Sequence, residues 1–140
     1  MFKVLAHTAD IALEVQADDL NSLFIDAANG WKNIVIENSE TQLHNVRSVK
    51  LASLEAEDLL VQWLSELNYF LTVHQWIMHE IQSLNIRTAK NELILEADVG
   101  GETLDAERHY IYCDIKAVTY HQLNIEKIAN QYQTRIIFDL

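Results

Sequence analysis

Two stretches of this 140-residue chain repeat apolar residues at spacings of three and four, and no other feature constrains the fold as strongly. The first runs from Leu20 to Val35 and the second from Leu59 to Leu71. In a helix this spacing places the apolar side chains on one stripe, so both stretches predict amphipathic helices with one buried side. Asp18 is expected to cap the first helix, because its side chain can accept a hydrogen bond from a backbone N–H of the first turn.

Most of the remaining chain alternates apolar and polar residues, which is the pattern of half-buried strands. Lys90 and Asn91 lie between two such segments and predict a hairpin turn. The predicted strands are residues 2–6, 11–17, 46–54, 84–88, 93–95, 110–121, 125–128 and 134–139. This order predicts an α+β fold: a single two-layer domain with a mostly antiparallel or mixed β-sheet covered by the two amphipathic helices.

The length and composition fit one domain that spans residues 1–140. Apolar residues make up 49% of the chain, and a chain of this length buries roughly 68% of its unfolded surface. Its single cysteine, Cys113, can form no intramolecular disulfide and no cysteine-based zinc cluster. The chain opens without a signal-peptide pattern and has no run of roughly 20 apolar residues, so a cytoplasmic protein without a membrane span is expected.

Acidic residues dominate the charge, since 21 Asp and Glu stand against 10 Lys and Arg and give a formal net charge of -11. Such a surface repels the phosphate backbone of nucleic acids, so no direct nucleic-acid binding is expected. A basic protein partner or a divalent cation is the more suitable counterpart.

The chain ends on two carboxylates directly after an apolar run. Asp139 and the α-carboxylate of Leu140 follow residues 135–138, where a buried carboxylate without a partner is costly. Another carboxylate, Asp10, lies between the first two predicted strands, where an aspartate often only serves a turn. If the last strand lies beside residues 2–6, however, three oxygen anions converge, and a hard divalent cation would suit them.

Sequence signals for catalysis are absent or incomplete. There is no Gly-x-Ser-x-Gly elbow, and Gly100-Gly101 lacks the flanking residues of a phosphate loop. His74 and His79 are five residues apart, which does not fit a helical zinc pair. We therefore expect no enzymatic activity of the protein itself. One alternative stays open, a small metal-dependent phosphoester hydrolase with His7 as the general base beside the carboxylates.

Three short motifs occur in the order found in a known family: His7-Thr8-Ala9-Asp10, then Lys116 to His121, and finally Asp139-Leu140. Together they resemble the archease family, small accessory proteins of the RtcB-type RNA ligase. The resemblance implies that Asp10, Asp139 and Leu140 bind a divalent metal, calcium in the first place and manganese or magnesium as alternatives. His7 is expected to orient Asp10 through a hydrogen bond. Lys116 is implied to belong to the surface that activates the ligase.

The same resemblance implies a function without catalysis of its own. The protein would promote guanylylation and repeated turnover of an RtcB-type ligase in tRNA splicing or RNA repair. A chaperone-like binding module is a further alternative, beside the hydrolase. For Lys116 the alternative to a functional role is an ion pair with Asp114 on the same strand face. His121 is expected to be structural or merely exposed.

Overall fold

Two α-helices and eight β-strands form the fold in the computed structural model, which describes residues 1–6, 9–36 and 40–140. The helices are α1 (Leu20–Ile36) and α2 (Ala56–Thr72). The strands are β1 (Phe2–Ala6), β2 (Asp10–Ala17), β3 (Asn45–Ser53), β4 (Trp76–Ala89), β5 (Glu92–Thr103), β6 (Ala117–Val118), β7 (Glu126–Ile128) and β8 (Gln131–Asp139). Neither of these helices is long and apolar enough to cross a membrane.

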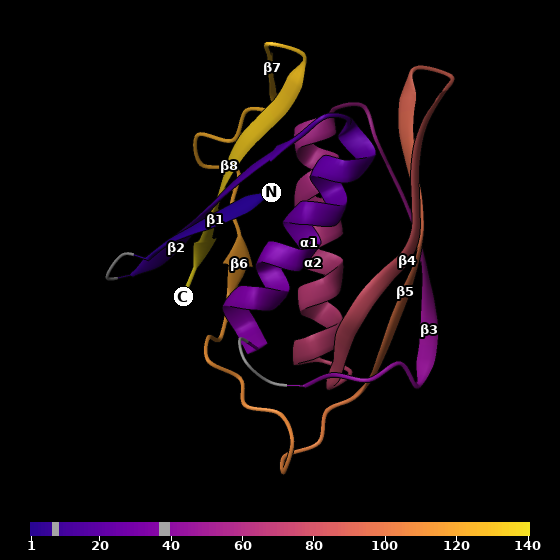
Figure 1. The fold of residues 1–140 in the computed structure, drawn as a ribbon. Coiled ribbons are helices and arrows are strands. Elements are labelled where there is room, and N and C mark those ends of the chain that lie inside the picture. Colours follow the sequence, from indigo (N-terminus) through magenta and orange to yellow (C-terminus); the bar gives the residue numbers. More distant parts are fainter. Residues whose placement is uncertain (7–8, 37–39) are drawn as a thin grey trace.

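The strands form two separate antiparallel sheets with the helices between them (Figure 1). The five-stranded sheet has the order β1-β2-β8-β6, and β7 pairs with the other part of β8. The three-stranded sheet has the order β3-β5-β4. Helix α1 packs on β2 of one sheet and on β4 of the other, and α2 packs on β3, β4 and β6. The molecule therefore has three layers, in the order sheet, helices, sheet.

The α+β class, the antiparallel pairing and the two helices are confirmed, but the number of layers differs from the expected two. The physical reason lies in the helices, which bury more than one stripe. Helix α1 buries nine residues that together cover about half of its circumference, and it contacts β2 of one sheet and β4 of the other. A helix that is apolar over so much of its circumference needs cover on two sides, and a second sheet supplies it.

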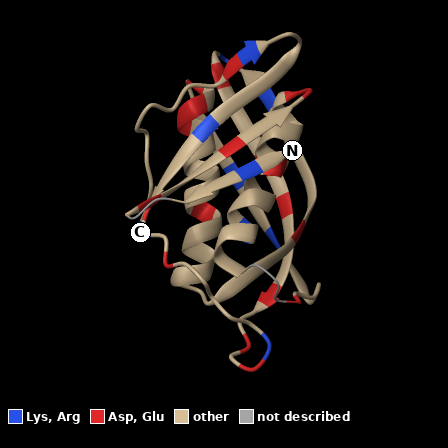
Figure 2. Ribbon diagram, turned by 60° about the vertical axis from the view of Figure 1, so that its left-hand side comes forward, with Lys and Arg blue, Asp and Glu red and all other residues tan. Residues whose placement is uncertain are grey.

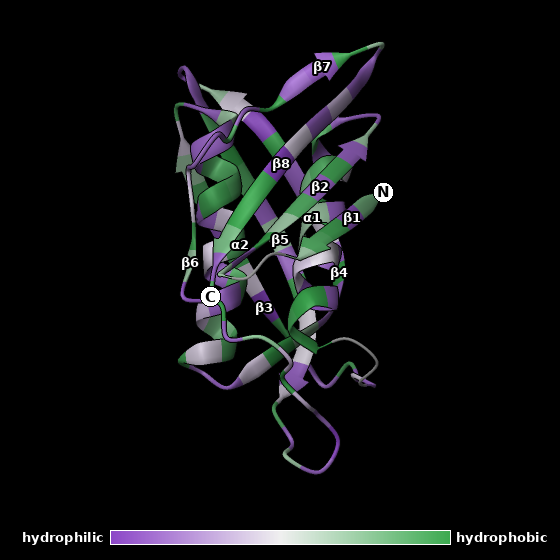
Figure 3. Cartoon of the chain, turned by 90° about the vertical axis from the view of Figure 1, so that its left-hand side faces the viewer, coloured by the Kyte–Doolittle hydropathy of each residue, from purple (hydrophilic) through white to green (hydrophobic). Residues whose placement is uncertain are grey.

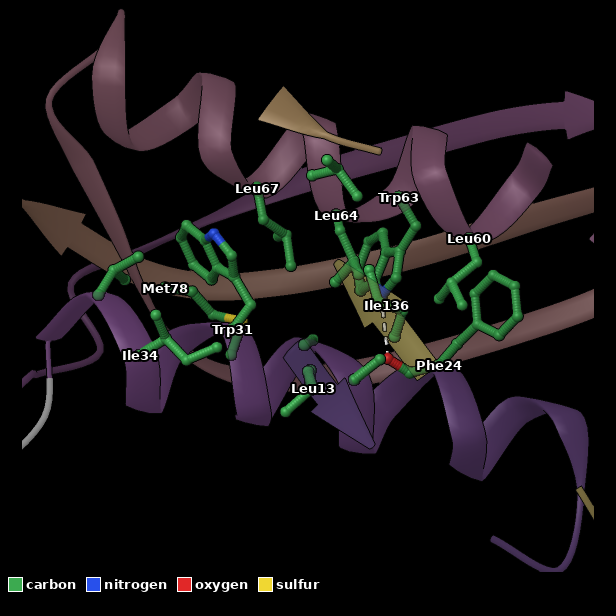
Figure 4. Packing of buried hydrophobic residues seen from close by; sticks show 14 of the residues in the cluster. Leu13, Phe24, Trp31, Ile34, Leu60, Trp63, Leu64, Leu67, Met78 and Ile136 are labelled. Carbon is green, nitrogen blue, oxygen red and sulfur yellow. Dashed lines mark hydrogen bonds between the residues drawn. The ribbon is translucent and has the colours of Figure 1, made fainter. Parts of the chain in front are cut away.

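Tryptophans fill the space between the two sheets (Figure 4). Trp31 of α1 and Trp63 of α2 are fully buried, and the indole N–H of Trp63 donates a hydrogen bond to the Phe24 carbonyl at 3.0 Å. Leu13 of β2 and Ile136 of β8 close this core from the side of the five-stranded sheet. The buried indole polar group is thus satisfied inside the core, as buried N–H groups require.

Gly30 allows α1 to approach the five-stranded sheet closely. A Cβ at this position would lie 2.6 Å from Leu13 Cδ1, and Leu13 is fully buried. Glycine in a helix costs about 1 kcal/mol relative to alanine. That cost is accepted here because the contact leaves no room for a larger side chain.

We expect Gly30→Ala to lower the free energy of unfolding by about 1 kcal/mol, because an overpacking cost of about 1–3 kcal/mol outweighs the gain in helix propensity. Urea denaturation measures the change. Asn29→Ala is the matched control, since Asn29 is exposed one position earlier in the same helix, and it should be neutral or slightly stabilising. A gain in stability from Gly30→Ala would contradict the tight contact with Leu13.

Local details agree with the sequence in part. Lys90 and Asn91 adopt φ values of 51° and 67° between β4 and β5, which is the conformation of a two-residue hairpin turn and confirms that prediction. The predicted capping residue of α1, Asp18, is wrong by one position. Asp19 accepts a hydrogen bond from the Ser22 N–H at 2.7 Å, while Asp18 accepts one from the Gln131 amide.

The strand predicted over residues 110–121 is also wrong for most of its length. Only Ala117–Val118 pair with a neighbouring strand. The backbone groups before them are bonded elsewhere: the Tyr112 N–H donates to the Val35 carbonyl at 2.9 Å, and the Ile115 carbonyl accepts from the Asn68 side chain. An alternating pattern forms no strand where the backbone already has such partners.

Candidate metal site at the ends of β2 and β8

Asp10 and Asp139 stand directly opposite each other on two paired strands. The register of β2 and β8 pairs Asp10 with Asp139 and, one step inward, Ile11 with Phe138. Ile11 and Phe138 are buried, so the alternation of side chains places the two carboxylates on the outer face of the sheet. Opposite Cβ atoms in antiparallel strands are about 4.5–5.5 Å apart.

The sequence predicted that the last strand lies beside residues 2–6. In the structure it lies beside residues 10–17 instead. Strand β2 occupies the position between β1 and β8. This arrangement is more favourable for a shared site, because Asp10 belongs to β2 and becomes the immediate neighbour of Asp139.

The last residue continues the same line. The Leu140 N–H donates to the Ala9 carbonyl at 3.4 Å, which keeps the end of the chain next to the start of β2. Asp10 is half-buried and Asp139 is exposed. Two like charges directly opposite each other are destabilising by roughly 0.2–1 kcal/mol, which a cation between them would relieve.

The donor atoms at this place are oxygens, which suits calcium, magnesium or manganese better than a soft metal. In the described part of the chain, no three His, Cys, Asp or Glu side chains gather closely enough to hold a metal ion. The α-carboxylate of Leu140 is a further oxygen group at this end of the sheet. His7 lies outside the described residues.

Strand β6 pairs with β8 on the side away from β2 (Figure 3). Lys116 directly precedes β6 and therefore lies on that side of Asp139. The Lys116 N–H donates to the Asp139 carbonyl at 2.8 Å, and the next residue, Ala117, stands opposite Asp139 in the register. The side chain of Lys116 is exposed. Within the described residues it forms no ion pair with Asp114, so the structure lacks the ion pair that was the alternative to a functional role.

A buried asparagine outside the three motifs holds residues 115–116 in place. Asn68 of α2 accepts a hydrogen bond from the Trp31 indole at 3.2 Å and donates one to the Ile115 carbonyl at 2.9 Å. Its position within the apolar stripe of α2 was the available signal, because a buried amide must find partners. The two helices are thereby linked to the residue that precedes Lys116.

A buried carboxylate holds the chain between β5 and β6 at a second point, nearer to β5. Glu102 at the end of β5 is 1% exposed and accepts hydrogen bonds from Arg108 and from the Gln42 N–H, the latter at 2.5 Å. The bond from Arg108 lowers the pKa of Glu102 to about 2, although burial opposes the shift. His109 Nε2 lies 3.3 Å from Glu102 without hydrogen-bond geometry, and His109 Nδ1 accepts from the Asp105 N–H.

His121 lies in an exposed turn after β6 and takes no part in the acidic pair. Its neighbour Tyr120 donates a hydrogen bond to Asp58 at the start of α2. Hydrogen bonds lower the pKa of Asp58; the largest effect comes from the Ser53 hydroxyl and the next largest from Tyr120. Tyr120 thus ties the turn to the helix layer, while the side chain of His121 is exposed.

The comparison with known proteins matches this chain over nearly its whole length. The model of the Archease protein family matches residues 2–140. Protein archease from Methanosarcina acetivorans is 34% identical over 139 residues, which cover 99% of this chain and 95% of the relative. Protein archease from Sulfurisphaera tokodaii is 27% identical over 139 residues, with 99% and 98% covered.

Two solved structures share the fold. The solution structure of protein 1598 from Methanobacterium thermoautotrophicum matches with a TM-score of 0.84 at 24% identity, over 99% of this chain and 98% of that chain. The crystal structure of an archease from Thermotoga maritima, described as a possible chaperone, matches with a TM-score of 0.61 at 24% identity, over 100% and 98%.

Fold and site together define a small α+β protein in which two antiparallel sheets enclose two helices and an acidic pair lies at a strand end. The chain belongs to the archease family. The resemblance predicted from the three motifs is thereby confirmed.

Proposed function

We propose that this protein is an accessory activator of an RtcB-type RNA ligase. It promotes guanylylation of the ligase and its repeated turnover in tRNA splicing or RNA repair, in the cytoplasm, and carries out no catalysis itself. Membership of the archease family over residues 2–140 supports this proposal. The observation that carries it within the structure is the direct pairing of Asp10 with Asp139 beside an exposed lysine.

A divalent cation belongs to the proposal as a bound cofactor. Asp10, Asp139 and the α-carboxylate of Leu140 would hold calcium, or manganese or magnesium in its place, and His7 would orient Asp10. Three oxygen ligands leave further coordination positions, since calcium takes six to eight oxygens. When bound, the cation neutralises the acidic pair and offers these positions to a group of the ligase.

Lys116 contributes the opposite charge at the same place. Its backbone is fixed by the hydrogen bond to Asp139 and by the neighbouring bond between Ile115 and Asn68. Its ammonium group extends from this fixed backbone into solvent. Such a group suits an acidic or phosphate group of the ligase.

We expect Lys116→Ala to reduce stimulation of the ligase about tenfold or more, with little change in stability, because an exposed lysine side chain contributes little packing energy. The rate of RNA ligation at saturating accessory protein measures the effect, and circular dichroism checks the fold. Lys50→Ala is the control, an exposed lysine on β3 in the other sheet. Equal stimulation by the Lys116→Ala and Lys50→Ala proteins would remove Lys116 from the proposed function.

An RNA ligation assay tests the function itself. With the ligase limiting, the number of RNA molecules joined per ligase should exceed one only when this protein is present. Ligation that is independent of the protein would contradict the proposal. Hydrolysis of a phosphoester by the purified protein with Mn²⁺ would favour the hydrolase, and suppressed aggregation of unrelated proteins would favour the chaperone-like module.

A further inference from the structure

The segment of residues 104–116, here called the 104–116 loop, connects β5 to β6 without a helix or strand of its own. In Figure 1 the loop lies below the helices, at the end of the molecule where the C-terminal ends of α1 and α2 are found. Loops of this length inside a compact domain are uncommon and are usually either functional or disordered. Its hydrogen bonds decide between these two explanations.

Four contacts fix the loop along its length. The Leu104 N–H donates to the Gln75 carbonyl at 2.7 Å, Arg108 binds the buried Glu102, and the Tyr112 N–H donates to Val35. The bond from Asn68 to residue 115 secures its end. Because hydrogen bonds from both helices and from β5 hold it, the loop has a fixed conformation and is not a loose linker.

Three consecutive apolar or aromatic residues of this fixed loop are nevertheless exposed. Tyr110 is 65% exposed, Ile111 36% and Tyr112 51%, and the two tyrosine rings pack edge to face at 4.6 Å. Single exposed apolar residues are ordinary on a protein surface, whereas a contiguous group on a rigid support marks an interaction site. Tyrosine is enriched at interfaces because it supplies a large contact area at a low cost in entropy.

The charge around the tyrosines indicates what they contact. Asp105, Glu107 and Asp114 are the acidic residues of the loop, and Figure 2 shows acidic colour at several points along it together with one basic stretch. Arg108 is engaged by Glu102 and Asp105, so its charge is already balanced. Glu107 and Asp114 therefore leave an excess of negative charge before and after the tyrosines in the loop, which suits a basic protein surface and repels an RNA backbone.

We propose that the 104–116 loop is the docking element for the ligase, with Tyr110 and Tyr112 inserting into an apolar patch that basic residues of the ligase surround. This inference rests on the proposed function and names the surface that the function uses. The loop leads directly into Lys116 and the acidic pair, so docking through it places these groups against the same partner.

The double variant Tyr110→Ala/Tyr112→Ala tests this surface. Loss of two aromatic anchors should weaken binding of the ligase at least about 30-fold, as loss of interface hot spots does. Isothermal titration calorimetry with the purified ligase measures the dissociation constant. The control is Leu54→Ala/Ile128→Ala, which removes two apolar side chains that are 74% and 50% exposed, before α2 and on β7.

Charge reversal provides a second arm. Glu107→Lys/Asp114→Lys should slow association and reduce its dependence on salt concentration, because rim charges act mainly on the rate of encounter. The control is Glu92→Lys/Glu126→Lys, two exposed acids on β5 and β7 with the same change in net charge. Equal effects of both pairs would mean that only the net charge matters, and the docking loop would be wrong.

Hydrogen exchange of the unmodified protein keeps the test independent of any variant's folding. Amides of residues 104–116 should exchange more slowly when the ligase is bound. The docking loop would be wrong, and the proposed function intact, if the complex forms and stimulates ligation while two quantities stay unchanged. These are the exchange rates of the loop amides on binding and the dissociation constant of the double variant. Absence of any complex would overturn both, and protection by RNA alone would assign the loop to nucleic acid instead.

Discussion

Asp10→Ala and Asp139→Ala are each expected to weaken binding of Ca²⁺ or Mn²⁺ by at least about 100-fold, because loss of groups that only support metal ligands already costs 10–100-fold. Stimulation of the ligase should decrease in parallel with the loss of metal affinity. The two carboxylates face each other across β2 and β8, so neither can replace the other. Titration calorimetry with each metal gives the affinity, and the ligation assay gives the stimulation.

Stability separates this expectation from simple damage to the fold. Without metal, either variant should be as stable as the parent or more stable by roughly 0.2–1 kcal/mol, because one of two opposed like charges has been removed. Added metal should stabilise only the parent. Glu14→Ala is the matched control: Glu14 is an exposed carboxylate on the same face of β2, opposite Lys3 and Arg135.

The α-carboxylate needs its own variant. Residues added after Leu140 turn that carboxylate into an amide, so metal affinity and ligase stimulation should fall together. The same residues added before Met1 should have a smaller effect. If the extended protein and the Asp10→Ala protein bind metal like the parent, the proposed metal site is wrong and Asp10 is only a residue of the β2–β8 pairing.

Glu102→Ala is expected to have the largest effect on stability, a loss of about 3 kcal/mol in the free energy of unfolding. For a domain of this size that corresponds to a melting temperature lower by roughly 10 °C. The variant removes the buried carboxylate that Arg108 and the Gln42 N–H share as an acceptor, and that lies beside the buried His109. Glu96→Ala is the control, because its ion pair with Arg87 is exposed and should cost at most about 1 kcal/mol.

The dependence of stability on pH, at acidic pH, tests the same Glu102 carboxylate. Because Arg108 lowers the pKa of Glu102 from 4.5 to about 2, the folded state binds this proton less readily than the unfolded state. Its contribution is therefore fully present above pH 4.5 and is lost as the pH falls towards 2. Thermal melts across this range should show a smaller decline for Glu102→Ala than for the parent. Parallel curves would contradict the ionised, buried state of Glu102.

The helices could be predicted because each repeats its apolar residues over several turns. Their position between two sheets could not, since periodicity reports which residues are apolar and not how many partners they meet. Gly30 illustrates the limit: as a residue it weakens a helix, and only the distance to Leu13 explains its presence. The predicted strand at residues 110–121 failed because Asn68 and Val35, far away in sequence, bind its backbone.

The acidic pair was predictable as a hypothesis from two motifs at opposite ends of the chain. Its register was not, because only the insertion of β2 between β1 and β8 sets Asp10 against Asp139. Glu102 could not be recognised at all from the sequence. It is one of 21 acidic residues, and its burial depends on Gln42 and Arg108, which come from separate loops.

Guanylylation of the ligase tests the account most directly. The purified ligase is incubated with labelled GTP, and covalently bound GMP is followed over time with no addition, with the parent protein or with the Asp10→Ala protein. The account predicts rapid and repeated guanylylation with the parent and a rate close to the unassisted one with Asp10→Ala. Equal rates in all three reactions would contradict it.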